Sequence, residues 1–123
     1  MVNLCQYIYY LIPPLKLPKP YILLKISRLN VTGMAIFPFI FTKTKIRSKV
    51  LINHELIHHR QQLELFILPF FLFYLIDYLI GLIKFRNHQK AYMNICFEKE
   101  AYKNDNNLQY LKNRPFWAFL KYI

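Results

Sequence analysis

The chain has 123 residues, which is enough for one domain with a single modest core. Its hydrophobic content of 55%, with only two glycines, excludes a disordered chain and is typical of a very apolar soluble domain or a small membrane protein. The net charge of +11 comes from basic residues scattered between Lys16 and Lys121, a pattern that disfavours a nucleic-acid groove and fits either a solvated surface or the rim of a membrane.

The N-terminal third predicts an extended arm followed by a β-hairpin. Residues 1–20 contain four prolines, which fix φ and remove backbone donors. Two apolar runs, Tyr21–Ile26 and Met34–Phe41, then flank a turn that contains Gly33, as expected for two paired strands. Pro38 lacks an N–H group and should make the second run an edge strand.

Helix formers dominate from about Val50 onwards, and Ser48 or Asn53 can cap the start of this helix. Pro69 is expected to break it, because a proline inside a helix removes a hydrogen bond and clashes with the preceding turn. The next segment, Phe70–Ile83, is almost wholly apolar. We therefore expect a helix, a break and a second, apolar helical segment.

A polar turn over residues 84–90 precedes another helical stretch near Ala91–Lys103. A breaker begins at Asp105, and Pro115 is expected to open a last helical turn as its first residue. The predicted fold is mainly α with a small N-terminal β-hairpin, an α+β class. The single domain, residues 1–123, divides into an arm with the first strand (1–33), a core (34–105) and a C-terminal helical tail (106–123).

The segment His54-Glu55-Leu56-Ile57-His58 is the strongest chemical signal in the sequence. Positions i and i+4 share one face of a helix, so both imidazoles can bind one zinc ion, with Glu55 beside them as general base. A chain with four His and four Glu contains about 0.004 such motifs by chance. The alternative is a basic helix face with two ordinary histidines. His59 points ~100° away from His58 and is a poor third ligand.

A catalytic zinc ion needs a third protein ligand and one open position. His88, in the predicted turn, is one candidate. Glu98 and Glu100 are better candidates, and only one of them can face the metal, since positions i and i+2 diverge by ~200° on a helix. The alternative for this pair is a solvated acidic patch that is paired with neighbouring lysines.

With these motifs the sequence resembles the gluzincin zinc peptidases, which carry His-Glu-x-x-His on one helix and a glutamate ligand on the next. In the membrane-embedded prenyl-protein and heat-shock peptidases of that group, the ligand begins a Glu-x-x-Ala-Asp motif, and Glu98-Lys99-Glu100-Ala101 matches its first four positions. The resemblance, over about residues 34–105, implies a core like that of the small minigluzincins, with His54, His58 and Glu98 as zinc ligands. Where the family has an Asp that orients a ligand histidine, this chain has Tyr102, so Tyr102 and Glu100 are the candidates for supporting contacts or an alternative ligand.

Chain length limits how the apolar segment can lie between the two ligand helices. A straight helix from His58 to Ile83 would end ~38 Å from the metal, and the helical steps from there to Glu98 cover only ~22 Å. A break at Pro69 allows the return, which favours an apolar helical hairpin with neither arm long enough to span a bilayer, although a spanning helix with a distorted return stays open. Asp77, within this segment, is either a partner for a Lys or Arg or a functional acid, and the first is favoured.

These observations predict a membrane-associated zinc hydrolase with Zn²⁺ as cofactor, which cleaves peptide or protein substrates with Glu55 as general base and acid. The strand near Met34–Phe41 can present an edge to an extended peptide. Two distant cysteines, Cys5 and Cys96, and the lack of a secretory signal pattern predict a site that faces the cytoplasm. The rival hypothesis is an inactive membrane or adaptor protein with a vestigial or structural metal motif. A nucleic-acid binder is the least favoured class, and the oligomeric state is open.

Overall fold

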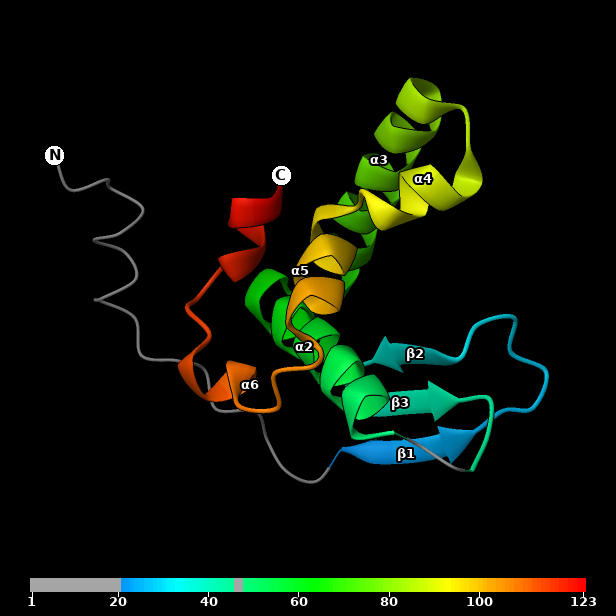
Figure 1. The fold of residues 1–123 in the computed structure, drawn as a ribbon, viewed down its shortest axis with the longest axis vertical. Coiled ribbons are helices and arrows are strands. Elements are labelled where there is room, and N and C mark those ends of the chain that lie inside the picture. Colours follow the sequence, from blue (N-terminus) through cyan, green and yellow to red (C-terminus); the bar gives the residue numbers. More distant parts are fainter. Residues whose placement is uncertain (1–20, 46–47) are drawn as a thin grey trace, which may run out of the picture.

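The computed structural model describes residues 21–45 and 48–123, so the predicted proline-rich arm and Cys5 lie outside the described residues. Three strands are followed by helices of very different lengths, as Figure 1 shows. The elements in chain order are β1 (Ile22–Lys25), β2 (Gly33–Ile36), β3 (Phe39–Thr42), α2 (Lys49–Leu65), α3 (Ile67–Phe85), α4 (His88–Met93), α5 (Cys96–Asn104), α6 (Tyr110–Asn113) and the 3₁₀ helix η1 (Ala118–Tyr122). The predicted α+β class, mainly helical with a small N-terminal sheet, is confirmed.

The sheet differs from the predicted hairpin in its pairing. Its order is β1-β3-β2, with β1 parallel to β3 and β2 antiparallel to β3. The second apolar run therefore holds two strands, which turn at Phe37 and Pro38. The prediction of a single edge strand there is wrong, because Pro38 lies in the turn and β3 begins after it as the central strand. β2 is the edge strand that packs against α2.

Helix α2 is enclosed by the rest of the molecule. Its N-cap is Ser48, whose Oγ accepts a hydrogen bond from Leu51 N–H at 3.0 Å. Asn53, the other capping candidate, instead donates from its amide to the carbonyl of Asp105 at 2.7 Å. Nearly every side chain from Asn53 to Glu64 is buried, since α2 packs against β2, α3 and α5. The polar side chains of this helix must therefore find their partners inside the protein.

The break after α2 lies earlier than predicted, at Phe66, which has a positive φ of 62°. Pro69 falls in the first turn of α3, where backbone N–H groups lack helical acceptors and a proline removes nothing. Helix α3 is long and apolar enough to cross a membrane by length and composition, unlike the short arm that the sequence suggested. It leads away from the sheet, and α4 and α5 bring the chain back beside it (Figure 1). The prediction placed the return in the apolar residues 70–83, whereas in the structure α4 and α5 make the return, and α4 carries polar side chains.

The core lies where α3, α5 and η1 meet. It contains Phe70 from α3, Phe97 from α5 and Phe119 from η1, all buried. A last helical turn is present as η1, but the prediction that it starts at Pro115 is wrong, because η1 begins only at Ala118. Arg114 is extended here, and its buried ion pairs with two glutamates fix this segment against α2 and α5.

Candidate metal centre

Two helices bring three potential metal ligands together. His54 and His58 lie one turn apart on α2, and Glu98 comes from the first turn of α5. The two Nε2 atoms are 3.2 Å apart, and each lies 3.4 Å from a different carboxylate oxygen of Glu98. All three side chains are buried, and their potential ligand atoms lie within 4.8 Å of one another. In the described part of the chain, these three side chains are the His, Cys, Asp or Glu residues that lie close enough together to hold a metal ion.

Gln61 fixes the orientation of His58. The Gln61 amide nitrogen donates to the carbonyl of Phe97 at 3.2 Å and to the carboxylate of Glu100 at 3.0 Å. Both of these atoms only accept hydrogen bonds, so the amide oxygen of Gln61 must face His58, where it lies 2.8 Å from Nδ1. The proton of a neutral His58 therefore sits on Nδ1, and the lone pair of Nε2 points into the site.

Asp105 plays the same role for His54. Its Oδ2 lies 3.3 Å from Nδ1 of His54, and the Asn53 amide holds the backbone of the same residue through its carbonyl. A carboxylate in this position favours the tautomer that leaves Nε2 free for a metal. No sequence pattern indicated this role, since Asp105 belongs to a helix-breaking stretch. Tyr102 stands where the gluzincin motif that this sequence resembles has its orienting Asp. Its ring packs against that of His54, with the ring centroids 4.6 Å apart.

The donor atoms of this site fit a cation. With protons on both Nδ1 atoms, two imidazole lone pairs face each other across 3.2 Å and also face a carboxylate. Oε2 of Glu98 is buried without a hydrogen-bond partner among the described residues. Such an arrangement is repulsive unless a metal ion or an additional proton lies between the donors. Two imidazoles with one carboxylate form a donor set that suits zinc and leave a position open.

The electrostatics of the site favour positive charge. Burial alone would lower the pKa of His58, but the adjacent Glu98 carboxylate raises it to about 9. Burial would conversely raise the pKa of Glu98, yet the two histidines hold it well below its usual range. Tyr74 adds a hydrogen bond from its hydroxyl to Oε1 of Glu98 at 2.7 Å. The carboxylate of Glu98 is therefore held ionised and ready to bind a cation.

Glu55 lies beside the ligands and against the sheet. It lines a cavity of about 230 Å³ together with His54, His58 and Glu98. Burial raises the pKa of the Glu55 carboxyl, and the two histidines partly offset this rise. Its Oε1 would lie 2.5 Å from a Cβ built on Gly33, so the absence of a side chain at Gly33 gives the carboxylate its space. The Glu55 carboxyl therefore lies in the same cavity as the two histidines and Glu98, next to the edge strand.

The other candidate residues lie outside the ligand group. Glu100 accepts hydrogen bonds from Arg114 and reaches His58 only through Gln61, so it supports the site and is not placed to bind the metal. His88 pairs with the hydroxyl of Tyr78 at 2.7 Å and lines an outer cleft. His59 contacts the carbonyl of Phe39 at 2.9 Å, away from the site, as its position on the helix predicted.

Asp77 has a different partner from the expected Lys or Arg. Its carboxylate accepts a hydrogen bond from the backbone N–H of Cys96 at 2.7 Å, which is the start of α5. Asp77 thus links α3 to the helix that carries Glu98. The charge near a helix N-terminus is favourable, since the free N–H groups there carry partial positive charge.

Comparison with known proteins added no relatives: no family model, no curated protein and no solved structure matches this chain. The function of this chain is therefore inferred from the geometry of the site.

Proposed function

We propose that this protein is a zinc-dependent hydrolase that cleaves peptide bonds. One observation carries the proposal: the potential ligand atoms of three buried side chains, His54, His58 and Glu98, lie within 4.8 Å of one another, and Oε2 of Glu98 has no hydrogen-bond partner in the described residues. Burying such a group without a cation costs several kcal/mol, about 2–7 for a single unpaired polar group. The resemblance to gluzincins in the sequence supports the same assignment.

The supporting residues have defined tasks in this proposal. A bound zinc ion would supply Lewis-acid polarisation and a water of lowered pKa. Glu55 accepts the proton of the attacking water at its carboxylate and then donates it to the leaving amine. Gln61 and Asp105 keep the two imidazoles in the tautomer that exposes Nε2. The raised pKa of Glu55 brings its proton affinity closer to that needed for both transfers.

The edge of the sheet offers a place for an extended peptide. β2 has β3 on one side only, and the Ala35 carbonyl on its other side accepts a hydrogen bond from Gln62 at 2.9 Å. The backbone of Gly33, two residues earlier in β2, faces the same side of the strand as that of Ala35, and Gly33 lies next to Glu55. A substrate strand that pairs near Gly33 would bring its backbone to the catalytic base, which supports a peptide as substrate.

Metal analysis of the purified chain tests the site, and a peptide-library assay tests the reaction. We expect close to one zinc per chain, a loss of zinc in His58→Ala and Glu98→Ala, and full zinc content in Glu55→Gln. Cleavage by Glu55→Gln should fall by a factor of about 10²–10⁴.

Two results would contradict the proposal in different ways. No zinc after growth and purification with excess metal would remove the metal site altogether. Full zinc content with no cleavage above the Glu55→Gln level would favour the rival hypothesis, a non-enzymatic protein with a structural metal.

A further inference from the structure

Helix α3 exposes an apolar face along its whole length. One side of the helix packs on α4 and the core, and the opposite side carries exposed aliphatic residues that include Leu72, Leu75, Leu79, Ile80 and Ile83. Ile83 is 79% exposed, and Leu68 near the other end of the helix is 81% exposed. A continuous apolar face of this length is much larger than the scattered apolar residues of an ordinary protein surface.

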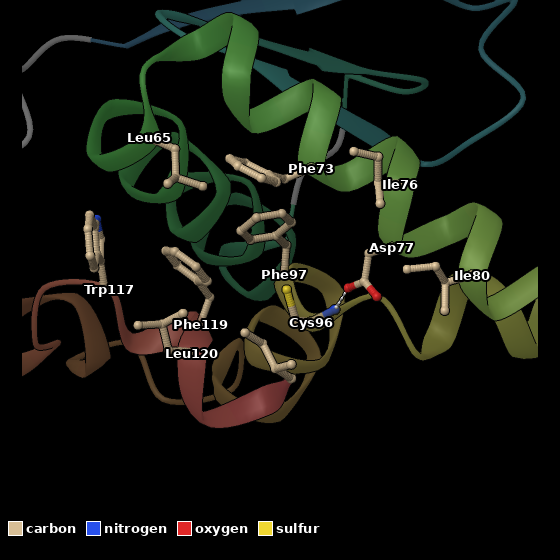
Figure 2. A pocket seen from close by; sticks show the side chains of 11 residues that line it. Leu65, Phe73, Ile76, Asp77, Ile80, Cys96, Phe97, Trp117, Phe119 and Leu120 are labelled. Carbon is tan, nitrogen blue, oxygen red and sulfur yellow. Dashed lines mark hydrogen bonds between the residues drawn. The ribbon is translucent and has the colours of Figure 1, made fainter. Parts of the chain in front are cut away.

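A groove continues this face on to η1, as Figure 2 shows. Its cavity of about 320 Å³ lies between Phe73 and Ile76 of α3 on one side and Trp117 and Leu120 at η1 on the other. Asp77 in its wall already accepts the hydrogen bond of Cys96 N–H, drawn as a dashed line. The apolar surface therefore extends from one element to another and is not confined to a single helix.

Most acidic side chains are buried, whereas most basic side chains of the described chain lie on the surface. Five of the six acids are buried, in the metal centre or in the Arg114 ion pairs, and Asp77 is half-buried. Eleven Lys and Arg residues of the described chain are exposed, and among them Lys84 and Arg86 lie at the C-terminal end of α3 and Lys121 lies in η1. The exposed charge around the apolar face is thus positive, which complements an anionic lipid surface.

The packing of α4 argues against α3 as a membrane-spanning helix. A Cβ built on Gly81 would lie 3.1 Å from the Cα atom of Ala91, so α4 lies directly against the C-terminal half of α3. The exposed side chains of α4 include Gln89 and Lys90. If lipid tails surrounded α3 on all sides, these polar groups would enter the hydrocarbon core at high cost.

We propose that the face formed by α3 and η1 docks on the surface of an anionic phospholipid bilayer, with α3 lying in the plane of the membrane. The apolar face then enters the boundary between headgroups and acyl chains, while α4 and its polar residues stay on the aqueous side. Anionic lipids are concentrated in the cytoplasmic leaflet, which fits the expected orientation. The proposal does not depend on the metal centre.

Sedimentation of the full chain with preformed vesicles tests this docking. We expect binding to vesicles of phosphatidylcholine and phosphatidylglycerol in equal parts, and weaker binding to phosphatidylcholine alone or at high salt. Leu72→Gln with Ile80→Gln should weaken binding at least about tenfold, because two apolar side chains leave the boundary region. Ile22→Gln with Leu24→Gln is the matched control, since these residues are similarly apolar and exposed but lie on β1.

The depth of a tryptophan near the middle of α3 distinguishes lying from spanning. In a Leu75→Trp variant with Trp117→Phe, lipids brominated near the headgroup should quench fluorescence more than lipids brominated at the chain ends. Stronger quenching from the chain ends would show a spanning helix and overturn the proposed orientation. Equal loss of binding in both pairs of variants would overturn the docking face. A stable dimer in light scattering, disrupted by Leu72→Gln with Ile80→Gln and without vesicle binding, would assign the face to a second copy.

Discussion

Glu55 and Gly33 form a contact that links the sheet to the chemistry of the site. A Cβ at residue 33 would lie 2.5 Å from Oε1 of Glu55 and 3.0 Å from the Leu51 side chain. The carboxylate is the flexible end of its side chain, so it can move away at little cost in folding free energy. The position of the Glu55 carboxylate therefore depends on the missing side chain at Gly33 of the edge strand.

We predict that Gly33→Ala keeps the fold and the metal but loses hydrolysis. The added methyl group displaces the Glu55 carboxylate, which lowers the proton-transfer contribution, by about tenfold or more if the base is moved out of reach. Zinc content and thermal unfolding check the intact site, and the cleavage rate checks the base. Ala35→Gly in the same strand is a control that adds no atom near Glu55, and an unchanged rate in Gly33→Ala would contradict this account.

The affinity for zinc should depend on pH in the direction set by His58. Its pKa of about 9 without metal means that zinc must displace a proton below that pH. As the pH falls from 9, the apparent dissociation constant should rise by up to about tenfold per unit from this group, and above 9 this dependence should disappear. Titration of the protein with zinc and a zinc indicator, at values between about pH 6 and about pH 9, measures this slope. A flat profile would mean that His58 is already deprotonated and that the carboxylate does not act on it as argued.

At the scale of single elements, the junction between α2 and α3 contains backbone strain. Phe66 has φ 62° and ψ 144°, a region that is almost exclusive to glycine, and its side chain is 78% exposed. The ring therefore contributes little burial at this position. The sharp change in direction lets α3 pass the metal centre and place Tyr74 against Glu98.

We predict that Phe66→Gly raises the free energy of unfolding by about 1 kcal/mol, because the strain is relieved at a site with little packing to lose. Urea denaturation measures the change. Phe66→Ala is the matched control, since it removes the same ring but keeps a Cβ in the strained conformation. Equal stability of the two variants would show that the backbone at this junction is not strained.

At the scale of the whole molecule, a buried ion cluster joins the C-terminal tail to the metal centre. Arg114, fully buried, pairs with Glu64 of α2 and Glu100 of α5. Glu64 also accepts the backbone N–H of Trp117 at 3.2 Å, and Glu100 binds the Gln61 amide that orients His58. The tail thus contacts both α2 and α5, and it reaches His58 through the single intermediate side chain of Gln61 after Glu100.

We predict that Arg114→Met destabilises the protein by about 3–5 kcal/mol, because it leaves two buried carboxylates without their cation. Thermal unfolding at neutral pH measures the loss. Adding Glu64→Gln and Glu100→Gln to Arg114→Met removes the uncompensated charges, so much of the stability should return. If the triple variant were no more stable than the single one, packing and not charge would explain the effect.

The sequence alone determined the local features of this protein. The placement of His54 and His58 on one face depends only on the period of a helix. The residue types near the start of α2 limited the cap to Ser48 or Asn53, and the structure selects Ser48. The apolar composition of residues 70–83 likewise predicted an apolar helical segment, which the structure contains within α3. These are properties of neighbouring residues, which a local pattern can contain.

The tertiary structure decided which distant groups meet. The spacing of Glu98 and Glu100 showed only that they diverge, and the packing of α5 turned Glu98 toward the histidines and Glu100 toward Arg114. The sequence pattern did not predict Asp105 as a partner of His54, because it assigned this residue only to a helix-breaking stretch. The parallel pairing of β1 with β3 was equally hidden, because strand registers depend on contacts across the sheet and not on the turn between adjacent runs.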